Sequence, residues 1–434
     1  MSKCVNLRAE AQALLETNIL RFWQERMVDY QQGGFYGRID GYNVLHPDAE
    51  KGAVLNARIL WTFSAAARVL HNTPYRILAA RAYDYLVQRF IDREQGGVYW
   101  SLNADGTPLD TKKQTYAIAF AIYGLAEYYR ATQDSEALNA AIRLFEDLET
   151  HAFHVSPLEG ESEGVGYLEA LTRDWQPIAD MRLSEKDENA TFTMNTHLHV
   201  LEAYTNLYRV LKNVQRDDVR CTMYNVQGTK ERVERQLRTL IDIFVTRIFD
   251  PSTGHLLLFF DENWHPLSSS LSLASEGLRP IGCPVDIHRT SRGEVSPGHD
   301  IEAAWLLHEA LEVFGDEVLL NQTLPVIHSL AQAAEEGIMD EKEWWCFAEA
   351  VVGYLDQWKL YQGEKPIESN INLELAETAF LYIQNCLIDR ENGEWFWSVL
   401  PDGTPDRTHD KAGFWKCPYH NSRMCIELIE RLNS

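Results

Sequence analysis

Apolar residues recur at helical spacing along most of the chain. Leu55, Ile59, Phe63, Ala67 and Leu70 lie three or four residues apart, which places them on one face of a helix. The segments 117–129 and 194–210 follow the same period. Short aromatic runs separate the helical segments. Each run leads into a turn rich in Asp, Asn and Gly and then to Pro, an order typical of β-hairpins.

The hairpin segments return at a nearly constant interval. They are found at 33–37, 96–100, 166–168, 254–256 and 393–397, and Asp105-Gly106-Thr107-Pro108 has a close counterpart in Asp402-Gly403-Thr404-Pro405. Gly34 and Gly97 lie 63 residues apart, and Gly97 and Gly166 lie 69 apart. A unit of about 65 residues therefore holds one hairpin and two helices, and roughly six such units fit into the chain.

This repeat predicts an all-α fold, an (α/α)6 barrel of six helical hairpins in a closed toroid, with short β-hairpins at one end. A closed toroid is one domain. We therefore expect residues 1–434 to form a single catalytic domain, although length alone suggests roughly three. Two segments break the repeat, a polar one at about 212–231 and one rich in Ser, Gly and Pro at about 267–294. We predict that both are inserted loops.

Charge and cysteine usage narrow the class of protein. The formal net charge is −24, with 64 acidic and 40 basic residues, so we expect neither a nucleic-acid nor a membrane partner. Seven Cys without a CxxC pair and the lack of an apolar leader predict a cytoplasmic protein with reduced thiols. We expect a monomer or a weak homo-oligomer. The 48 aromatic residues, 12 Trp, 19 Tyr and 17 Phe, fit a large core or a sugar-binding cleft.

Two His residues stand at equivalent places near predicted helix starts. Each follows a Pro by two residues, as Pro297-Gly298-His299 and Pro418-Tyr419-His420, and the two His lie 121 residues apart, about two repeat units. At a helix start the dipole disfavours the imidazolium, so the neutral imidazole can act as a general base. Glu302, three residues after His299, is expected to fix its tautomer. The simpler alternative is that each His only caps its helix.

Two further polar positions lie in apolar helical segments. Asn195 and His199 are four residues apart and share a face, whereas His197 and His199 point apart and cannot bind one metal ion. A satisfied core His is the alternative for His199. Arg58 has mostly apolar neighbours, so we expect its guanidinium to point into the barrel. Its partner there is either a structural carboxylate or a substrate oxygen that becomes negative.

Common cofactor and metal motifs are missing from the sequence. Gly164-Val165-Gly166 is not followed by the third Gly of a dinucleotide-binding loop, and no P-loop, GxSxG or zinc-ligand spacing occurs. We therefore expect chemistry performed by side chains alone, without a cofactor or a metal.

Four motifs together carry a family resemblance. They are residues 56–64 (NARILWTFS), 194–199 (MNTHLH), 298–303 (GHDIEA) and 415–421 (WKCPYHN). With them the chain resembles the acylglucosamine 2-epimerase superfamily, and within it the cellobiose 2-epimerases, with mannose 2-epimerases as a second group. The family fold is an (α/α)6 barrel, in agreement with the repeat.

The resemblance implies a cofactor-free inversion of C2 in the reducing-end aldose of β-1,4-linked disaccharides such as cellobiose. The ring opens, one His removes the C2 proton to form a cis-enediolate, and a second His returns a proton to the opposite face. The resemblance assigns His299 and His420 as this pair, His199 to ring opening, Arg58 to the enediolate oxygens, Asn195, Glu302 and Tyr116 to substrate contacts, and Trp345 and Trp415 to the cleft walls.

The two predicted inserts keep other sugar chemistries open. If both lie at the cleft mouth, they narrow the room for a second sugar ring, which favours a mannose 2-epimerase acting on monosaccharides. A mannose–fructose aldose–ketose isomerase would use the same enediolate. A glycoside hydrolase, a more remote alternative, would need two carboxylates across the cleft. A sugar-binding protein without catalysis would exchange no proton.

Overall fold

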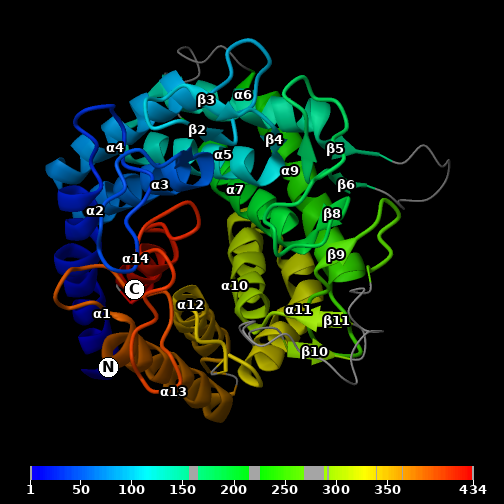
Figure 1. Ribbon diagram of the computed structural model, residues 1–434. Coiled ribbons are helices and arrows are strands. Elements are labelled where there is room, and N and C mark those ends of the chain that lie inside the picture. The colour runs from blue at the N-terminus through cyan, green and yellow to red at the C-terminus, as the bar shows by residue number, and fades with distance from the viewer. Residues whose placement is uncertain are drawn as a thin grey trace, which may run out of the picture.

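The helices of the computed structural model form two concentric layers (Figure 1). The structure describes residues 2–155, 165–214, 225–267, 288–290, 293–338, 340–363 and 365–432. The inner layer contains α3 (Ala53–Leu70), α5 (Thr115–Thr132), α7 (Met194–Asn213), α10 (Pro297–Phe314), α12 (Trp344–Leu360) and α14 (His420–Arg431). The outer layer contains α1 (Ser2–Leu14), α2 (Leu20–Arg26), α4 (Thr73–Tyr85), α6 (Ser135–His151), α9 (Val226–Ile243), α11 (Glu317–Glu335) and α13 (Pro366–Tyr382).

The inner layer is a closed ring. Each inner helix packs against the next in the order α3, α5, α7, α10, α12 and α14, and α14 packs against α3. Each inner helix also packs against an outer one, and α1 at the N-terminus pairs with α14 at the C-terminus. The (α/α)6 barrel predicted from the repeat is confirmed. Within the described ranges, no helix is both long and apolar enough to cross a lipid bilayer.

The inner helices are buried because they are apolar on nearly every side. In α5, every residue from Thr115 to Tyr129 is buried. Glycine allows close approach where two inner helices cross. A Cβ at Gly124 of α5 would lie 2.8 Å from the carbonyl oxygen of Ala57 in α3, and one at Gly353 of α12 would lie 3.0 Å from that of Ile301 in α10.

The predicted hairpins lie at the end of the barrel where the inner helices begin, and all the strand pairs are antiparallel. The pairs are β1 (Lys51–Gly52) with β2 (Ser101–Leu102), β2 with β3 (Pro108–Asp110), β4 (Lys113–Gln114) with β7 (Ala170–Leu171), β5 (Phe153–His154) with β6 (Gly166–Tyr167), β8 (Phe192–Thr193) with β9 (Phe259–Phe260), and β10 (His288–Thr290) with β11 (Gly293–Val295).

One turn occurs four times between an outer and an inner helix in the described part of the chain. A π-helical turn directly precedes the second, third and fourth copies: η2 (Leu86–Phe90), η3 (Phe244–Ile248) and η5 (Ile383–Leu387). Before the first copy, the π-helical turn η1 (Leu15–Ile19) lies earlier in the chain, between α1 and α2. The four turns start at Asp29, Asp92, Asp250 and Asp389. In each, the Asp carboxylate accepts the backbone N–H two residues later, and a β-bridge encloses the turn. The repeat is therefore structural as well as sequential.

Polar links close the ring again at the opposite end, where the inner helices finish. They join each inner helix to the next through Arg68–Glu127, Glu127–Asn206, Arg209–Glu309, His308–Asp356, Asp356–Arg431 and Glu430–Arg68. Basic side chains near helix C-termini also suit the helix dipole. This end is thus fixed by hydrogen bonds and ion pairs, while the hairpin end carries the loops.

The first predicted insert is shorter than the sequence suggested. Residues 212–213 end α7 and residues 226–231 begin α9, so both ends of the predicted loop are helical. The helix starts early because the Asn225 side chain accepts the Gly228 N–H and because Val226 and Val233 are buried on one face. Residues 215–224 lie outside the described residues. Val214, their described flank, lies 15 residues beyond His199, about 22 Å along the helix axis, at the end opposite the hairpins.

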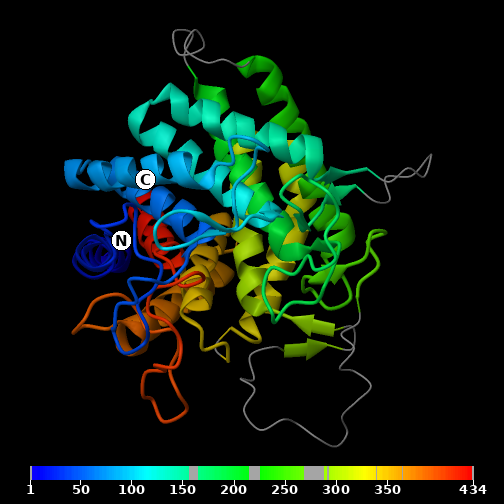
Figure 2. The same cartoon turned by 45° about the horizontal axis from the view of Figure 1, so that its top comes forward.

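The second predicted insert lies largely outside the described residues, which omit 268–287 and 291–292. Its described part is the β10–β11 pair, and β11 leads directly into α10. In Figure 2 this pair lies below the helical ring. The described flanks of the second insert, unlike those of the first, therefore lie at the hairpin end.

Candidate active site

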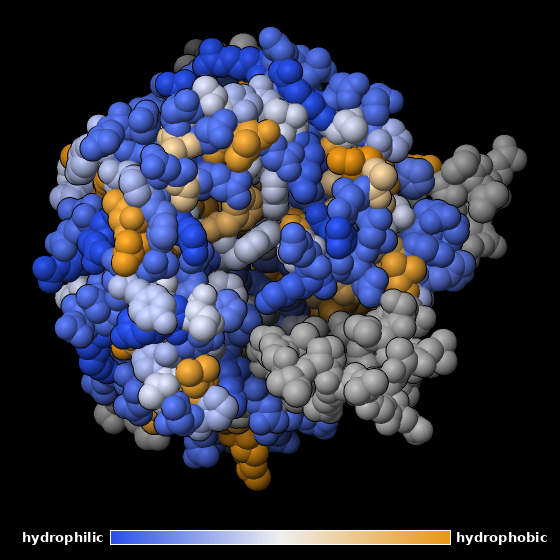
Figure 3. Space-filling model, viewed as in Figure 1, coloured by the Kyte–Doolittle hydropathy of each residue, from blue (hydrophilic) through white to orange (hydrophobic). Residues whose placement is uncertain are grey.

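A cavity of about 400 Å³ opens at the hairpin end of the barrel, and Figure 3 shows a hollow at the centre of that face. All nine site residues predicted from the sequence line it: Arg58, Tyr116, Asn195, His199, His299, Glu302, Trp345, Trp415 and His420. The loop 183–187, Glu343, Trp344 and Trp397 complete its wall. Sequence reasoning did not assign them to the site. Trp397 was noted only as part of the recurring hairpin segment 393–397, and the others stand in no distinctive motif.

The cavity lies where the six inner helices begin. Tyr116, Asn195, His299 and His420 belong to the first turns of α5, α7, α10 and α14. The N-terminus of a helix carries a partial positive charge and unpaired backbone N–H groups. Six such ends around one cavity favour an anionic group inside it.

Three imidazoles face this cavity, and each is held through its Nδ1 atom. Nδ1 of His299 lies 2.8 Å from the Ser296 hydroxyl, Nδ1 of His199 lies 2.9 Å from the Glu202 carboxylate, and Nδ1 of His420 lies 2.6 Å from the Glu349 carboxylate. Among the described residues, no protein group bonds to Nε2 of any of the three. The ring orientations are fixed, and the reactive nitrogen of each ring is left for a ligand.

Burial keeps these imidazoles neutral. It lowers the pKa of His299 to about 3, with the nearby His199 as a smaller cause. Burial also lowers the pKa of His420, and the positive charges of Arg58 and Arg423 lower it further. The pKa of His199 is lowered by burial, against the opposing effect of Glu202. Burial, rather than the helix dipole we expected to matter, is the largest cause.

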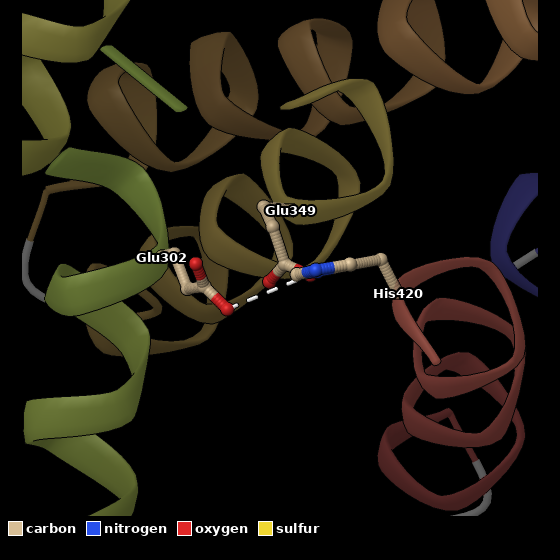
Figure 4. Close-up of side chains that lie close together, drawn as sticks. All are labelled: Glu302, Glu349 and His420. Carbon is tan, nitrogen blue, oxygen red and sulfur yellow. Dashed lines mark hydrogen bonds and ion pairs between the residues drawn. The ribbon is translucent and has the colours of Figure 1, made fainter. Parts of the chain in front are cut away.

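The predicted contact between Glu302 and His299 is wrong. Glu302 instead accepts a hydrogen bond from Nη2 of Arg423 at 2.5 Å, and one of its oxygens lies 3.8 Å from Nδ1 of His420. Figure 4 shows Glu302, Glu349 and His420 converging from α10, α12 and α14. Glu302 lies one turn into α10 and points toward α14, across the ring of helices. Ser296 lies just before α10 and takes the place next to His299 that we expected for Glu302.

A buried cluster of three carboxylates surrounds Arg423. Its guanidinium pairs with Glu202, Glu302 and Glu349. One cation does not offset three buried acids, so burial and the like charges of Glu349 and Glu202 raise the pKa of Glu302 to about 8. Oε2 of Glu302 has no hydrogen-bond partner among the described residues. The cluster therefore takes up a proton more readily than exposed carboxylates do.

The same cluster contains the one metal-like arrangement seen among the described residues. Ligand atoms of Glu302, Glu349 and His420 lie within 4.8 Å of one another. The Arg423 guanidinium already supplies the positive charge that pairs with these carboxylates, and its charge would repel a metal cation bound beside it. A single Glu in an otherwise apolar helical run, as in Phe347-Ala348-Glu349-Ala350-Val351, was the signal available in the sequence.

Arg58 points into the barrel, as predicted, and its side chain is 3% exposed. It donates to the Tyr116 hydroxyl at 2.9 Å and to Sγ of Cys417 at 3.4 Å. Within the described part of the chain its Nε has no hydrogen-bond partner, and the ring centres of Phe120 and Tyr419 lie within 4.5 Å of the guanidinium carbon. No carboxylate among the described residues pairs with it. Of the two possible partners, a structural carboxylate is therefore ruled out within the described chain.

Aromatic side chains form the walls of the cavity. The Trp345 ring lies 4.7 Å from the His299 ring and 5.5 Å from the His420 ring, and its Nε1 donates to Glu343 at 2.7 Å. A second cavity of about 560 Å³ shares Trp345 and Trp397 with the first and extends to His409. The Trp397 and His409 rings stack at 5.0 Å. Flat apolar faces of this kind suit sugar rings.

Comparison with known proteins places this site in a family. The family model for N-acylglucosamine 2-epimerase matches residues 34–422. The chain belongs to this family. A cellobiose 2-epimerase of Bacteroides fragilis is 48% identical over 440 residues, covering 98% of each chain. One from Ruminococcus albus is 36% identical, again over 98% of each chain.

A solved structure of a cellobiose 2-epimerase, from Bacillus thermoamylovorans B4167, resembles the whole fold. It has a TM-score of 0.80 and 35% identity, covering 98% of this chain and 99% of that one. The residues that line the cavity, from Arg58 to His420, all lie in the part matched by the N-acylglucosamine 2-epimerase family model. The resemblance seen in the four motifs is confirmed over the full length of the chain.

Proposed function

We propose that this carbohydrate epimerase, an isomerase, inverts C2 of the reducing-end aldose of β-1,4-linked disaccharides such as cellobiose. The observation that carries the proposal is the set of three imidazoles around one cavity, each with Nδ1 bonded and with no partner for Nε2 among the described residues. Relatives that are 48% and 36% identical over nearly the whole chain bear the name cellobiose 2-epimerase.

In the proposed reaction, His199 assists ring opening to the aldehyde. Nε2 of one imidazole of the His299–His420 pair then takes the C2 proton, and the electrons of the broken C–H bond form an enediolate. The other imidazole delivers a proton to the opposite face of C2. Carbon is neither oxidised nor reduced overall, so the reaction needs no redox cofactor.

Base strength alone cannot drive the first proton transfer. The C2 proton is roughly ten pK units less acidic than an imidazolium, a gap of about 14 kcal/mol. Donors aimed at the developing oxyanion contribute about 3–4 kcal/mol each. Arg58, which pairs with no carboxylate among the described residues, is placed to donate, and the six helix N-termini add their field. The neutral His199 can donate only a proton that its Nε2 has first taken up during ring opening.

The two imidazoles must enter the reaction in different protonation states, one with a free lone pair on Nε2 and the other with a proton there. The Glu349 carboxyl at 2.6 Å from Nδ1 of His420 can give or accept the second proton on that ring. Burial raises the pKa of Glu349, so this carboxylate accepts a proton more readily than an exposed glutamate does. His420 can therefore present either form, as a reversible epimerisation requires.

The size of the site favours a disaccharide. The cavity of about 400 Å³ holds the imidazoles, and the adjoining one of about 560 Å³ shares its aromatic wall. The two cavities also share Asn195 and His299, so a monosaccharide beside the imidazoles would leave unfilled the part of the second cavity that extends to His409. We propose further that residues 1–434 act as one catalytic domain, in the cytoplasm, as a monomer or weak homo-oligomer with a small sugar as its partner.

The test follows cellobiose by NMR with the wild type and with His299→Ala and His420→Ala. We expect the wild type to form the mannose-configured epimer and each variant to lose at least about 100-fold in kcat. His328→Gln is the control, because His328 bonds to Gln357 in the outer part of the barrel and should leave activity unchanged. Free glucose as the product would show a hydrolase, and full activity in either Ala variant would refute the proposal.

A further inference from the structure

The recurring turn departs from its own pattern ahead of two inner helices. Five residues after the turn Asp, the turns before α3 and α5 have glycine, Gly34 and Gly97, with φ of +63° and +64°. In the turns before α10 and α14 the same position holds His255 and Glu394. These are the two helices that carry His299 and His420.

Glu394 keeps the backbone conformation of the glycines it replaces. Its φ is +62°, a left-handed conformation that is strained for a residue with a Cβ. Its carboxylate is fully buried and accepts hydrogen bonds from Trp23 Nε1 at 2.6 Å, Lys416 Nζ at 2.8 Å and Asn421 Nδ2 at 2.6 Å. Glycine at position 394 would avoid the strain. The advantage of Glu394 over glycine is therefore its carboxylate, with the three hydrogen bonds that it accepts.

His255 makes the corresponding link on the other side of the ring. Its Nδ1 lies 2.6 Å from Oδ2 of Asp300, and the next backbone N–H, that of Leu256, donates to Oδ1 of Asp300 at 2.9 Å. Asp300 directly follows His299, and Asn421 directly follows His420. Both linked residues are fully buried.

We propose that His255 and Glu394 are positioning residues for the two imidazoles. Each ties the first turn of its helix, through Asp300 or Asn421, to a rigid turn, and so fixes the distance from Nε2 to the C2 atom of the sugar. The inference rests on the two-imidazole reaction proposed above. Small displacements matter there, because a misplacement of about 1 Å can cost on the order of 100-fold in rate.

A partition experiment in heavy water separates positioning from general stability. The imidazole that has taken the C2 proton exchanges it with solvent. The enediolate then either receives deuterium from that imidazole, which labels the starting sugar, or receives deuterium from the opposite one, which gives the epimer. Mass spectrometry and NMR measure the ratio of labelled starting sugar to epimer early in the reaction. This ratio does not depend on how much of the enzyme is folded.

The two positioning residues should move this ratio in opposite directions from the same starting sugar. Misplacing the imidazole that delivers the second proton raises the ratio, and misplacing the one that takes the first proton lowers it. We expect Glu394→Gln and His255→Gln each to change it by about tenfold, in opposite senses. If Glu394→Gln does not fold, Asn421→Ala breaks the same link and leaves the Glu394–Lys416 pair intact.

Asp389→Asn is the matched control. It lies in the same turn as Glu394, but its carboxylate bonds to Lys411 and to the turn itself. It should lower stability and leave the ratio unchanged. An unchanged ratio in both Asn421→Ala and His255→Gln, or shifts in the same direction, would overturn the inference. A wild type that neither labels nor epimerises the sugar would instead overturn the proposed function.

Discussion

Replacing Arg58 by Met should remove catalysis while leaving the fold intact. The guanidinium is buried, and its two hydrogen-bond partners are the Tyr116 hydroxyl and the Cys417 thiol. Burial raises the pKa of both groups, so both are neutral. In the free protein, therefore, Arg58→Met breaks no ion pair and removes a charge that is costly to bury.

The magnitude follows from Coulomb's law. A guanidinium about 4 Å from an enediolate oxygen, at an effective dielectric constant of about 20, contributes about 4 kcal/mol. Losing it should lower kcat by on the order of 1,000-fold. The free energy of unfolding should stay within about 1 kcal/mol of the wild type, or rise.

The assay combines steady-state epimerisation of cellobiose with urea denaturation of the same preparations. Arg423→Met is the contrasting control, since Arg423 pairs with Glu202, Glu302 and Glu349 and its loss should cost about 3–5 kcal/mol. An Arg58→Met enzyme within threefold of the wild-type kcat would refute the reasoning. So would a loss of several kcal/mol of stability in that variant.

Three further predictions concern stability and substrate choice. Burial lowers the pKa of His308, but the hydrogen bond and the charge of Asp356 outweigh it and raise this pKa above 6.5. The stability that the charged His308 gives the fold is therefore complete below pH 6.5 and is lost as the pH rises through the pKa of the folded protein. His308→Asn should therefore cost about 1–3 kcal/mol in urea denaturation at pH 6 and less at pH 9, and equal losses would contradict this. Burial raises the pKa of Glu169 to about 7, so the wild type should lose stability between pH 4.5 and pH 8. Glu169→Gln should flatten that decline in Tm, whereas parallel curves would show another cause. His409→Ala should raise KM for cellobiose about tenfold and KM for glucose less, because His409 lines the second cavity and stacks on Trp397 there, whereas Trp397 itself also lines the first cavity. Equal changes in the two KM values would place both sugars in the same subsite.

The repeat explains which site residues could be predicted from the sequence alone. His299 and His420 could be paired from their positions in the repeat, because a regular ring brings equivalent positions to the same end. Arg58 was recognisable as a charge in an apolar helical run. Glu349 carries the same signal, but many charges in such runs only face solvent, and no spacing rule connects Glu349 with a residue 71 positions later. Its bond to His420 depends on how α12 and α14 pack.

Other features needed the folded chain for clear physical reasons. The contact expected between Glu302 and His299 assumed that neighbours on one helix face interact, whereas packing in the ring gives Glu302 a stronger partner in Arg423. The predicted edges of the first insert were wrong because polar residues can begin and end helices: Asn225 caps α9. The positioning links of His255 and Glu394 join different repeat elements, which a linear pattern does not reveal.

The isotope at C2 of the product tests the central claim most directly. Cellobiose is converted by the wild-type enzyme in heavy water, and the mannose-configured epimer is isolated at low conversion. Transfer between two imidazoles on opposite faces predicts one deuterium at C2 of essentially every product molecule, since the second imidazole draws its proton from solvent. An epimer that retains the original C2 hydrogen would contradict this mechanism.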